Sequence, residues 1–196
     1  MRVNHFKKLG FTLIELIAGI VVFGIGLAIV TSLIATQSRQ SIDPIWQVRA
    51  VELGHSLLNE INAKAFDEHA DLLGGQDRCN ESVPCSTSSE LGSDVGETRP
   101  TFDDIDDYNG LDASGAAIVN SQGQALTSSD GNFYAGFRIQ VSVFYDDNLD
   151  GINDDDTDQN GTLDSGNLIG NRKLIQIAIQ TPGGDIIPLS LVKANH

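Results

Sequence analysis

Residues 7–35 read KKLGFTLIELIAGIVVFGIGLAIVTSLIA, and this stretch determines the architecture of the chain. From Phe11 to Ala35 it carries a single charge, that of Glu15. A helix that rises ~1.5 Å per residue crosses a hydrocarbon core of ~30 Å within that length. The apolar core of a secretory signal peptide is shorter, ~7–15 residues, and holds no carboxylate. We therefore expect a membrane-spanning helix rather than a cleaved signal peptide.

Charge along the chain has the distribution of a membrane-anchored protein whose body lies outside the cytoplasm. The 196 residues include 27 Asp and Glu against 12 Lys and Arg, a formal net charge of -15. Arg2, Lys7 and Lys8 precede the apolar stretch, and Lys7 and Lys8, directly before it, place the N-terminus on the cytoplasmic side by the positive-inside rule. The acidic remainder excludes a nucleic-acid partner, because it cannot neutralise a phosphate backbone.

Glu15 marks a functional site, because an ionised carboxylate inside a bilayer is costly unless it is paired. It lies five residues after Gly10 in the string KKLGFTLIEL. This string resembles the leader of the type IV prepilin family, in which a short basic leader ends in Gly and Glu is the fifth mature residue. The resemblance implies cleavage between Gly10 and Phe11 by a prepilin peptidase and N-methylation of Phe11. It also implies that Glu15 pairs with the Phe11 ammonium of a neighbouring subunit.

A helical pattern continues beyond the membrane segment, with apolar residues at steps of three and four. These residues are Ile42, Trp46, Ala50, Leu53, Leu57 and Ile61. The pattern predicts an amphipathic helix to about Phe66, bent near Pro44. The expected organisation is a leader (1–10), a transmembrane and assembly helix (11–35), its amphipathic extension (36–66) and an extracytoplasmic head (67–196).

Three strands are predicted in the C-terminal half of the chain. Residues 133–145 alternate apolar and polar side chains, and residues 174–181 and 186–192 flank a Pro-Gly-Gly-Asp turn as a hairpin. An antiparallel sheet with one apolar face needs a cover, which the amphipathic helix supplies. The expected fold is α+β and type IV pilin-like, a long N-terminal helix packed on a small antiparallel sheet.

Cys79 and Cys85 lie close together in CNESVPC. In an exported protein this spacing predicts a small disulfide loop. A metal site is the weaker alternative, because no histidine is near enough to complete it.

Residues 146–167 are rich in Asp and Asn, and two registers of the segment have the oxygen spacing of a calcium loop. The better register comprises Asp156, Asp158, Asn160, Thr162 and Asp164, and the alternative comprises Asp146, Asn148 and Asp150. Both depart from an EF-hand at position twelve, where Thr157 and Asn167 replace the bidentate Glu. Calcium is the one candidate cofactor, but a solvated strand connector without a metal is the favoured interpretation.

The string FDDIDDYNGL, residues 102–111, is by itself an expected solvated acidic loop. Together with residues 49–68 and the YDDNLDG and TPGGD segments, it resembles the MshD family of minor pilins, from the mannose-sensitive haemagglutinin (MSHA) type IV pilus. That resemblance implies a role in pilus assembly and surface attachment. The implied location is the inner membrane with a periplasmic head, and then the pilus fibre at the surface of a Gram-negative cell.

The partners expected from these resemblances are the inner membrane, prepilin peptidase and other major and minor pilins, with no small-molecule substrate. A pseudopilin of a type II secretion system and a calcium-dependent tip adhesin are the alternative functions. An anchored enzyme is disfavoured, because the sequence holds neither a nucleophile motif nor a phosphate-binding loop.

Overall fold

The structure, a computed structural model, describes residues 12–40, 43–70, 78–129 and 131–195. The chain divides into two compact units, one reaching to Ile45 and one beginning at Trp46, and each is described by itself. Gly10 and Phe11, the expected cleavage site, lie outside the described residues.

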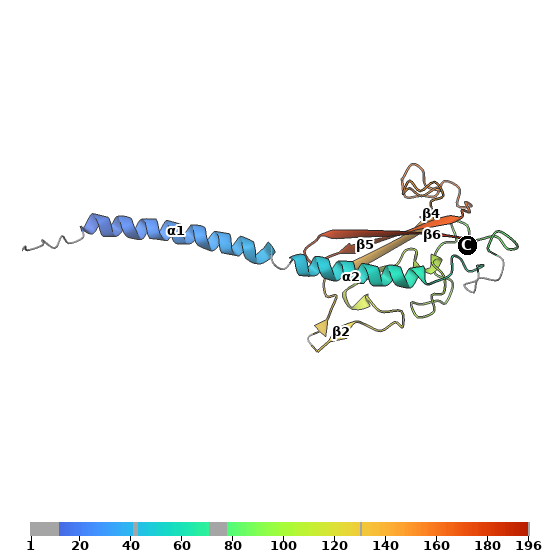
Figure 1. Cartoon of the computed structure of the whole chain (residues 1–196), viewed down its shortest axis with the longest axis horizontal. Helices are drawn as coiled ribbons and strands as arrows, with labels where there is room; N and C mark the ends of the chain where they lie inside the picture. Colours follow the sequence, from blue (N-terminus) through green and yellow to red (C-terminus); the bar gives the residue numbers. More distant parts are fainter. Residues whose placement is uncertain (1–11, 41–42, 71–77, 130, 196) are drawn as a thin grey trace, which may run out of the picture. The chain divides into compact units, whose positions relative to one another are not determined.

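Helix α1, Leu13–Gln40, forms nearly all of the described part of the first unit (Figure 1). Its start is fixed at Thr12, whose carbonyl accepts hydrogen bonds from the amides of Glu15 and Leu16. The stretch Leu13–Ser32 is long and apolar enough to cross a membrane, and none of it is buried within the chain. This confirms the expected N-terminal apolar helix.

Helix α2, Asp43–Asn62, lies mostly in the second unit. Pro44 lies in the first turn of α2, where backbone amides have no acceptor within the helix. The missing N–H of the proline therefore removes no helical hydrogen bond. The predicted end at Phe66 is wrong, since α2 ends four residues earlier. Beyond it Ala65 bonds instead to residues 103–105, donating to the Asp103 carbonyl and accepting from the Ile105 amide. A tertiary pairing therefore replaces the last helical turn.

The head contains a four-stranded antiparallel sheet in the order β1-β4-β5-β6. Its strands are β1 (Asp112–Ser114), β4 (Arg138–Tyr145), β5 (Arg172–Gln180) and β6 (Ile186–Ala194). A separate pair of strands consists of β2 (Thr127–Ser128) and β3 (Gly131–Asn132). The head also contains two short 3-10 helices, η1 (Asp106–Tyr108) and η2 (Gly115–Ala117). The predicted hairpin is confirmed as β5 and β6, which pair from Gln180–Ile186 outward.

The predicted strand beginning at residue 133 is wrong in its first part, because β4 begins at Arg138. The preceding residues fold into turns, with the amide of Ala135 bonded to the Asn132 carbonyl and that of Phe137 to the Tyr134 carbonyl. Gly136 has a φ of 81°, a left-handed conformation that ends the alternation. The sequence keeps its apolar alternation through residues 133–137, but the backbone there forms turns rather than a strand.

The core of the head lies between α2 and the sheet. Its helix side is formed by Ala50, Leu53, Leu57 and Ile61, and its sheet side by Ile139, Val141, Val143, Ile175, Ile177 and Ile179. At Gly54 a Cβ atom would come within 2.5 Å of Leu189 Cδ1 and 2.8 Å of Ile179 Cδ1. The glycine thus permits α2 to approach β5 and β6 closely, and Figure 1 shows α2 running alongside the sheet. The expected α+β fold, a long N-terminal helix with a small antiparallel sheet, is confirmed.

Candidate functional site

The first candidate site is the exposed apolar surface of α1 around Glu15. Large apolar side chains of the helix are about half exposed or more, among them Leu13 (75%), Ile14 (75%) and Phe23 (71%). Glu15 is the one charged residue between Leu13 and Ser32. Among the described residues, no cation lies within ion-pair distance of its carboxylate. A surface of this kind needs lipid or other apolar helices around it.

The second candidate site is a buried ionic cluster in the head, centred on Lys173 of β5. The Lys173 ammonium donates to both carboxylate oxygens of Asp106 at 2.7 Å, to Asp67 Oδ2 at 3.0 Å and to the Phe66 carbonyl at 3.0 Å. The side chains of Lys173 and Asp67 are 0% exposed, and that of Asp106 is 5% exposed. The rings of Phe66 and Tyr145 cover the ammonium, with centroids 4.4 and 5.1 Å away. All three donors of the ammonium are thereby used.

Residues 102–111 are therefore not the solvated acidic loop that was expected. Asp104, Asp106 and Asp107 are buried, although Asp103 is exposed. Their carboxylates bond to nearby backbone amides: Asp104 Oδ1 accepts from residues 106 and 107, and Asp107 Oδ2 accepts from residues 103 and 104. Lys173, distant in sequence, neutralises part of the negative charge. Backbone capping and a remote cation together make burial of the acidic string tolerable.

The carboxyl groups around Lys173 differ in pKa. Burial opposes ionisation of Asp67, but Lys173 and the backbone amides of His69 and Ser86 outweigh it, and the pKa is lowered. Burial raises the pKa of Asp106 to about 8 in spite of Lys173. Burial and the charge of Asp107 raise the pKa of Asp104 to about 6. Burial therefore favours the protonated form of Asp106, whereas Lys173 and the backbone amides favour the ionised form of Asp67.

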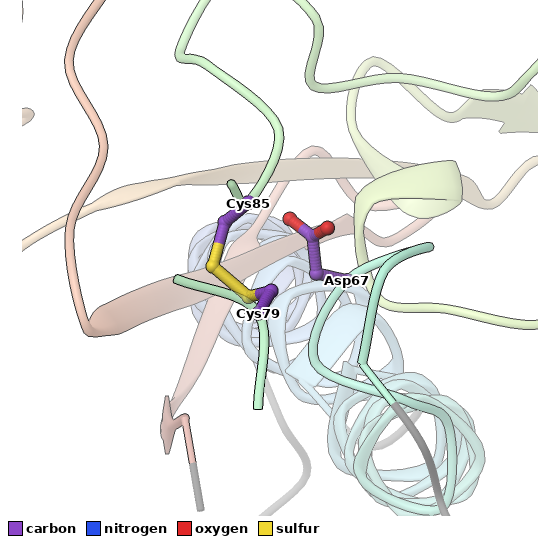
Figure 2. Close-up of side chains that lie close together, drawn as sticks. All are labelled: Asp67, Cys79 and Cys85. Atoms are coloured by element: carbon purple, nitrogen blue, oxygen red, sulfur yellow. A yellow bond between two sulfur atoms is a disulfide. The ribbon is translucent and has the colours of Figure 1, made fainter. Parts of the chain in front are cut away.

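The disulfide between Cys79 and Cys85 is confirmed, and both residues are buried. Figure 2 shows the Asp67 carboxylate beside it. The amide group of Asn195 donates to the Cys79 carbonyl at 2.9 Å and lies against both sulfur atoms. Because both sulfurs are bonded to each other, this group offers no thiolate to a metal.

The acidic segment 146–167 forms two turns of the same conformation. Asp146 accepts hydrogen bonds from the amides of residues 150 and 151, and Asp156 accepts them from residues 160 and 161. Asp155 is buried and accepts from Ser88, Ser165 and Gly166. Among the described residues, several groups of three acidic or cysteine side chains have ligand atoms within 4.8 Å of one another. None of these groups includes a residue of this segment.

The two proposed calcium registers are thus placed in similar turns, and calcium binding there stays a prediction. Asp158 and Asp164 serve as acceptors for Asn160 and Thr157, respectively.

Lys173 was missed by the sequence interpretation, although one signal was present. In β5 Lys173 lies on the same face of the strand as Ile175, Ile177 and Ile179. In the strand register it is opposite Tyr145. A lysine on the core-facing side of a strand requires a buried acidic partner.

A long exposed apolar helix with a lone acid in its first turn, followed by a small antiparallel sheet, is consistent with a type IV pilin-like α+β fold. A family model described as the prokaryotic N-terminal methylation motif matches residues 5–31. The motif contains Gly10, Phe11 and Glu15, and it supports a type IV prepilin-like protein that is membrane-anchored and structural rather than catalytic. Comparison with curated proteins and with solved structures found no match.

Proposed function

We propose that the chain is a minor pilin of an MSHA-type IV pilus and acts in the assembly of the fibre. The observation that carries the proposal is the exposed apolar helix α1 with the single carboxylate Glu15, inside a matching methylation motif. The assignment to the MSHA type and the MshD family rests on the sequence resemblance of residues 49–68 and 102–111.

Glu15 provides the chemistry of assembly in this proposal. Cleavage after Gly10 by prepilin peptidase creates a new ammonium on Phe11, which is then methylated. Within a bundle of apolar helices the Glu15 carboxylate of one subunit pairs with that ammonium on its neighbour. The attraction between the two charges then offsets the free-energy cost of burying them. The helix anchors the subunit in the inner membrane, with its head in the periplasm, until it enters the fibre.

The experiment is to delete the gene in its own host and to restore it with an epitope inserted at an exposed loop. A minor pilin should be found in sheared surface fibres, and its loss should reduce the number of fibres per cell. A pseudopilin of a type II secretion system would instead be absent from sheared fibres, and its loss would leave secreted enzymes inside the periplasm. Normal fibres and normal secretion in the deletion strain would contradict both assignments.

A further inference from the structure

The contact between Lys173 and Asp106 brings a primary amine close to a buried carboxyl group. Lys173 Nζ is 2.7 Å from each oxygen of Asp106, so it lies on the plane that bisects the carboxyl group and contains Cγ. A primary amine held against a carboxyl carbon is a nucleophile held against its electrophile. Proximity of this kind supplies a large part of the barrier reduction for acyl transfer.

The surroundings supply a proton acceptor and exclude water. Asp67 Oδ2 is 3.0 Å from the same Nζ, and its side chain is 0% exposed. The rings of Phe66 and Tyr145 close the remaining approach to the ammonium. Burial favours the protonated form of Asp106, which is the form whose hydroxyl can leave as water. Removal of water favours condensation over hydrolysis.

We propose that Lys173 and Asp106 condense to an amide that crosslinks the head, with Asp67 as the catalytic residue. The ammonium passes a proton to Asp67, and the free amine attacks Cγ of Asp106. The Nζ–Cγ bond forms, a Cγ–O bond breaks, and the leaving oxygen departs as water after receiving a proton. The amide keeps one hydrogen on Nζ, and Asp67 ends protonated. The cluster is neutral before and after, and no oxidant or other reactant is needed.

Three separate elements hold the reacting groups in place. Lys173 lies in β5, Asp106 begins η1, and Asp67 follows α2. An amide between residues 106 and 173 would enclose β1, β4 and the acidic segment 146–167 in one covalent loop. It would join the central strand β5 directly to the segment beside the end of α2.

The test is the intact mass of the full chain, purified from membranes in detergent and reduced. We expect the mass to be lower by one water than that of the uncrosslinked chain in the same state of leader cleavage and N-methylation. Digestion with trypsin should then yield a branched peptide that joins the segment beginning at Lys173 to the segment containing Asp106. A wild-type chain with the full mass and Lys173 in an ordinary linear peptide would overturn the proposal.

Matched variants separate this crosslink from other losses of water, such as an imide at Asp150–Gly151. Lys173→Arg keeps the positive charge but cannot form the amide, so its mass should return to the full value. Asp67→Asn keeps the shape but cannot accept the proton, and it should leave most of the chain uncrosslinked. Lys193→Arg, a substitution outside the cluster, should still lose one water. Persistence of the water loss in Lys173→Arg would also overturn the proposal.

Discussion

The apolar helix α1 and the buried cluster of the head place carboxylates in apolar surroundings in opposite ways. In the head, Asp67 and Asp106 meet Lys173 within the same chain, and the ion pairs are sealed by neighbouring rings. On α1, Glu15 has no cationic partner among the described residues, and the apolar side chains around it are exposed. The charges of the head are paired within one chain, whereas Glu15 has no cationic partner among the described residues, as the proposed pairing with a neighbouring subunit requires. Each prediction below breaks or sharpens this contrast.

The largest effect is expected at Glu15, where Glu15→Ala should abolish entry into fibres. The variant should still insert into the membrane and lose its leader, because the substitution makes the span more apolar. The fold of its head should be unchanged, because the substitution lies outside the second unit. Immunoblotting of sheared fibres and of membranes measures both. Glu52→Ala, at an exposed position of α2, is the matched control and should enter fibres normally.

Presence of the Glu15→Ala variant in fibres at the wild-type level would show that the charge of Glu15 has no role in assembly. The contrast between the two regions would then reduce to a difference in burial.

At Lys173 the expectation is reversed, with a large loss of stability. Lys173→Met removes the cation of the cluster together with the side chain that would form the proposed amide. Removing one partner of a buried ion pair alone costs about 3–5 kcal/mol. Denaturant unfolding followed by fluorescence of Trp46, the single tryptophan, measures the loss. Arg138→Met is the control, because its pair with Asp112 is solvent-exposed and contributes little. Equal effects of the two substitutions would contradict the special role of the buried pair.

The disulfide next to the cluster should have a smaller effect. Closing a loop with a sequence separation of 6 restricts the unfolded chain by about 2 kcal/mol. Cys79→Ser combined with Cys85→Ser should lower the free energy of unfolding by about that amount. Entry into fibres should persist if the head remains folded at the growth temperature. A loss as large as that of Lys173→Met would mean that the disulfide, rather than the ion pairs, holds the cluster together.

The smallest effect concerns pH. A hydrogen bond to Asp107, burial and the charges of Asp107 and Asp103 raise the pKa of Glu97 from 4.5 to about 7. Between these values the folded state binds more protons than the unfolded state, so its stability falls as pH rises. Glu97→Gln should flatten the decline between about pH 4.5 and about pH 7, measured as the melting temperature in a buffer series. An unchanged decline would assign the pH dependence to Asp104 and Asp106 instead.

Patterns that depend on local spacing could be predicted from the sequence. The apolar run predicted α1, and apolar residues at steps of three and four predicted the buried face of α2. The alternation of apolar and polar residues around the Pro-Gly-Gly-Asp turn predicted β5 and β6. The short sequence separation of the two cysteines predicted the disulfide.

The buried state of residues 102–111 could not be predicted in this way. Four aspartates in one short string are typical of a solvated loop, and their burial depends on Lys173, which lies in another element. The start of β4 failed for a related reason, because side-chain alternation does not report the left-handed backbone at Gly136. Local patterns determine the elements, and remote pairs determine which polar groups are buried.

The position of Asn195 has a practical consequence for labelling the protein. Its side chain is buried against the disulfide, and its backbone amide bonds to the Asn171 carbonyl. A fluorescent or affinity fusion attached immediately beyond Asn195 would begin beside this packed contact and strain it. The tip of the acidic segment, residues 157–165, is exposed throughout and lies away from α1 in sequence. A short tag inserted there should allow growing fibres to be imaged without disturbing either region.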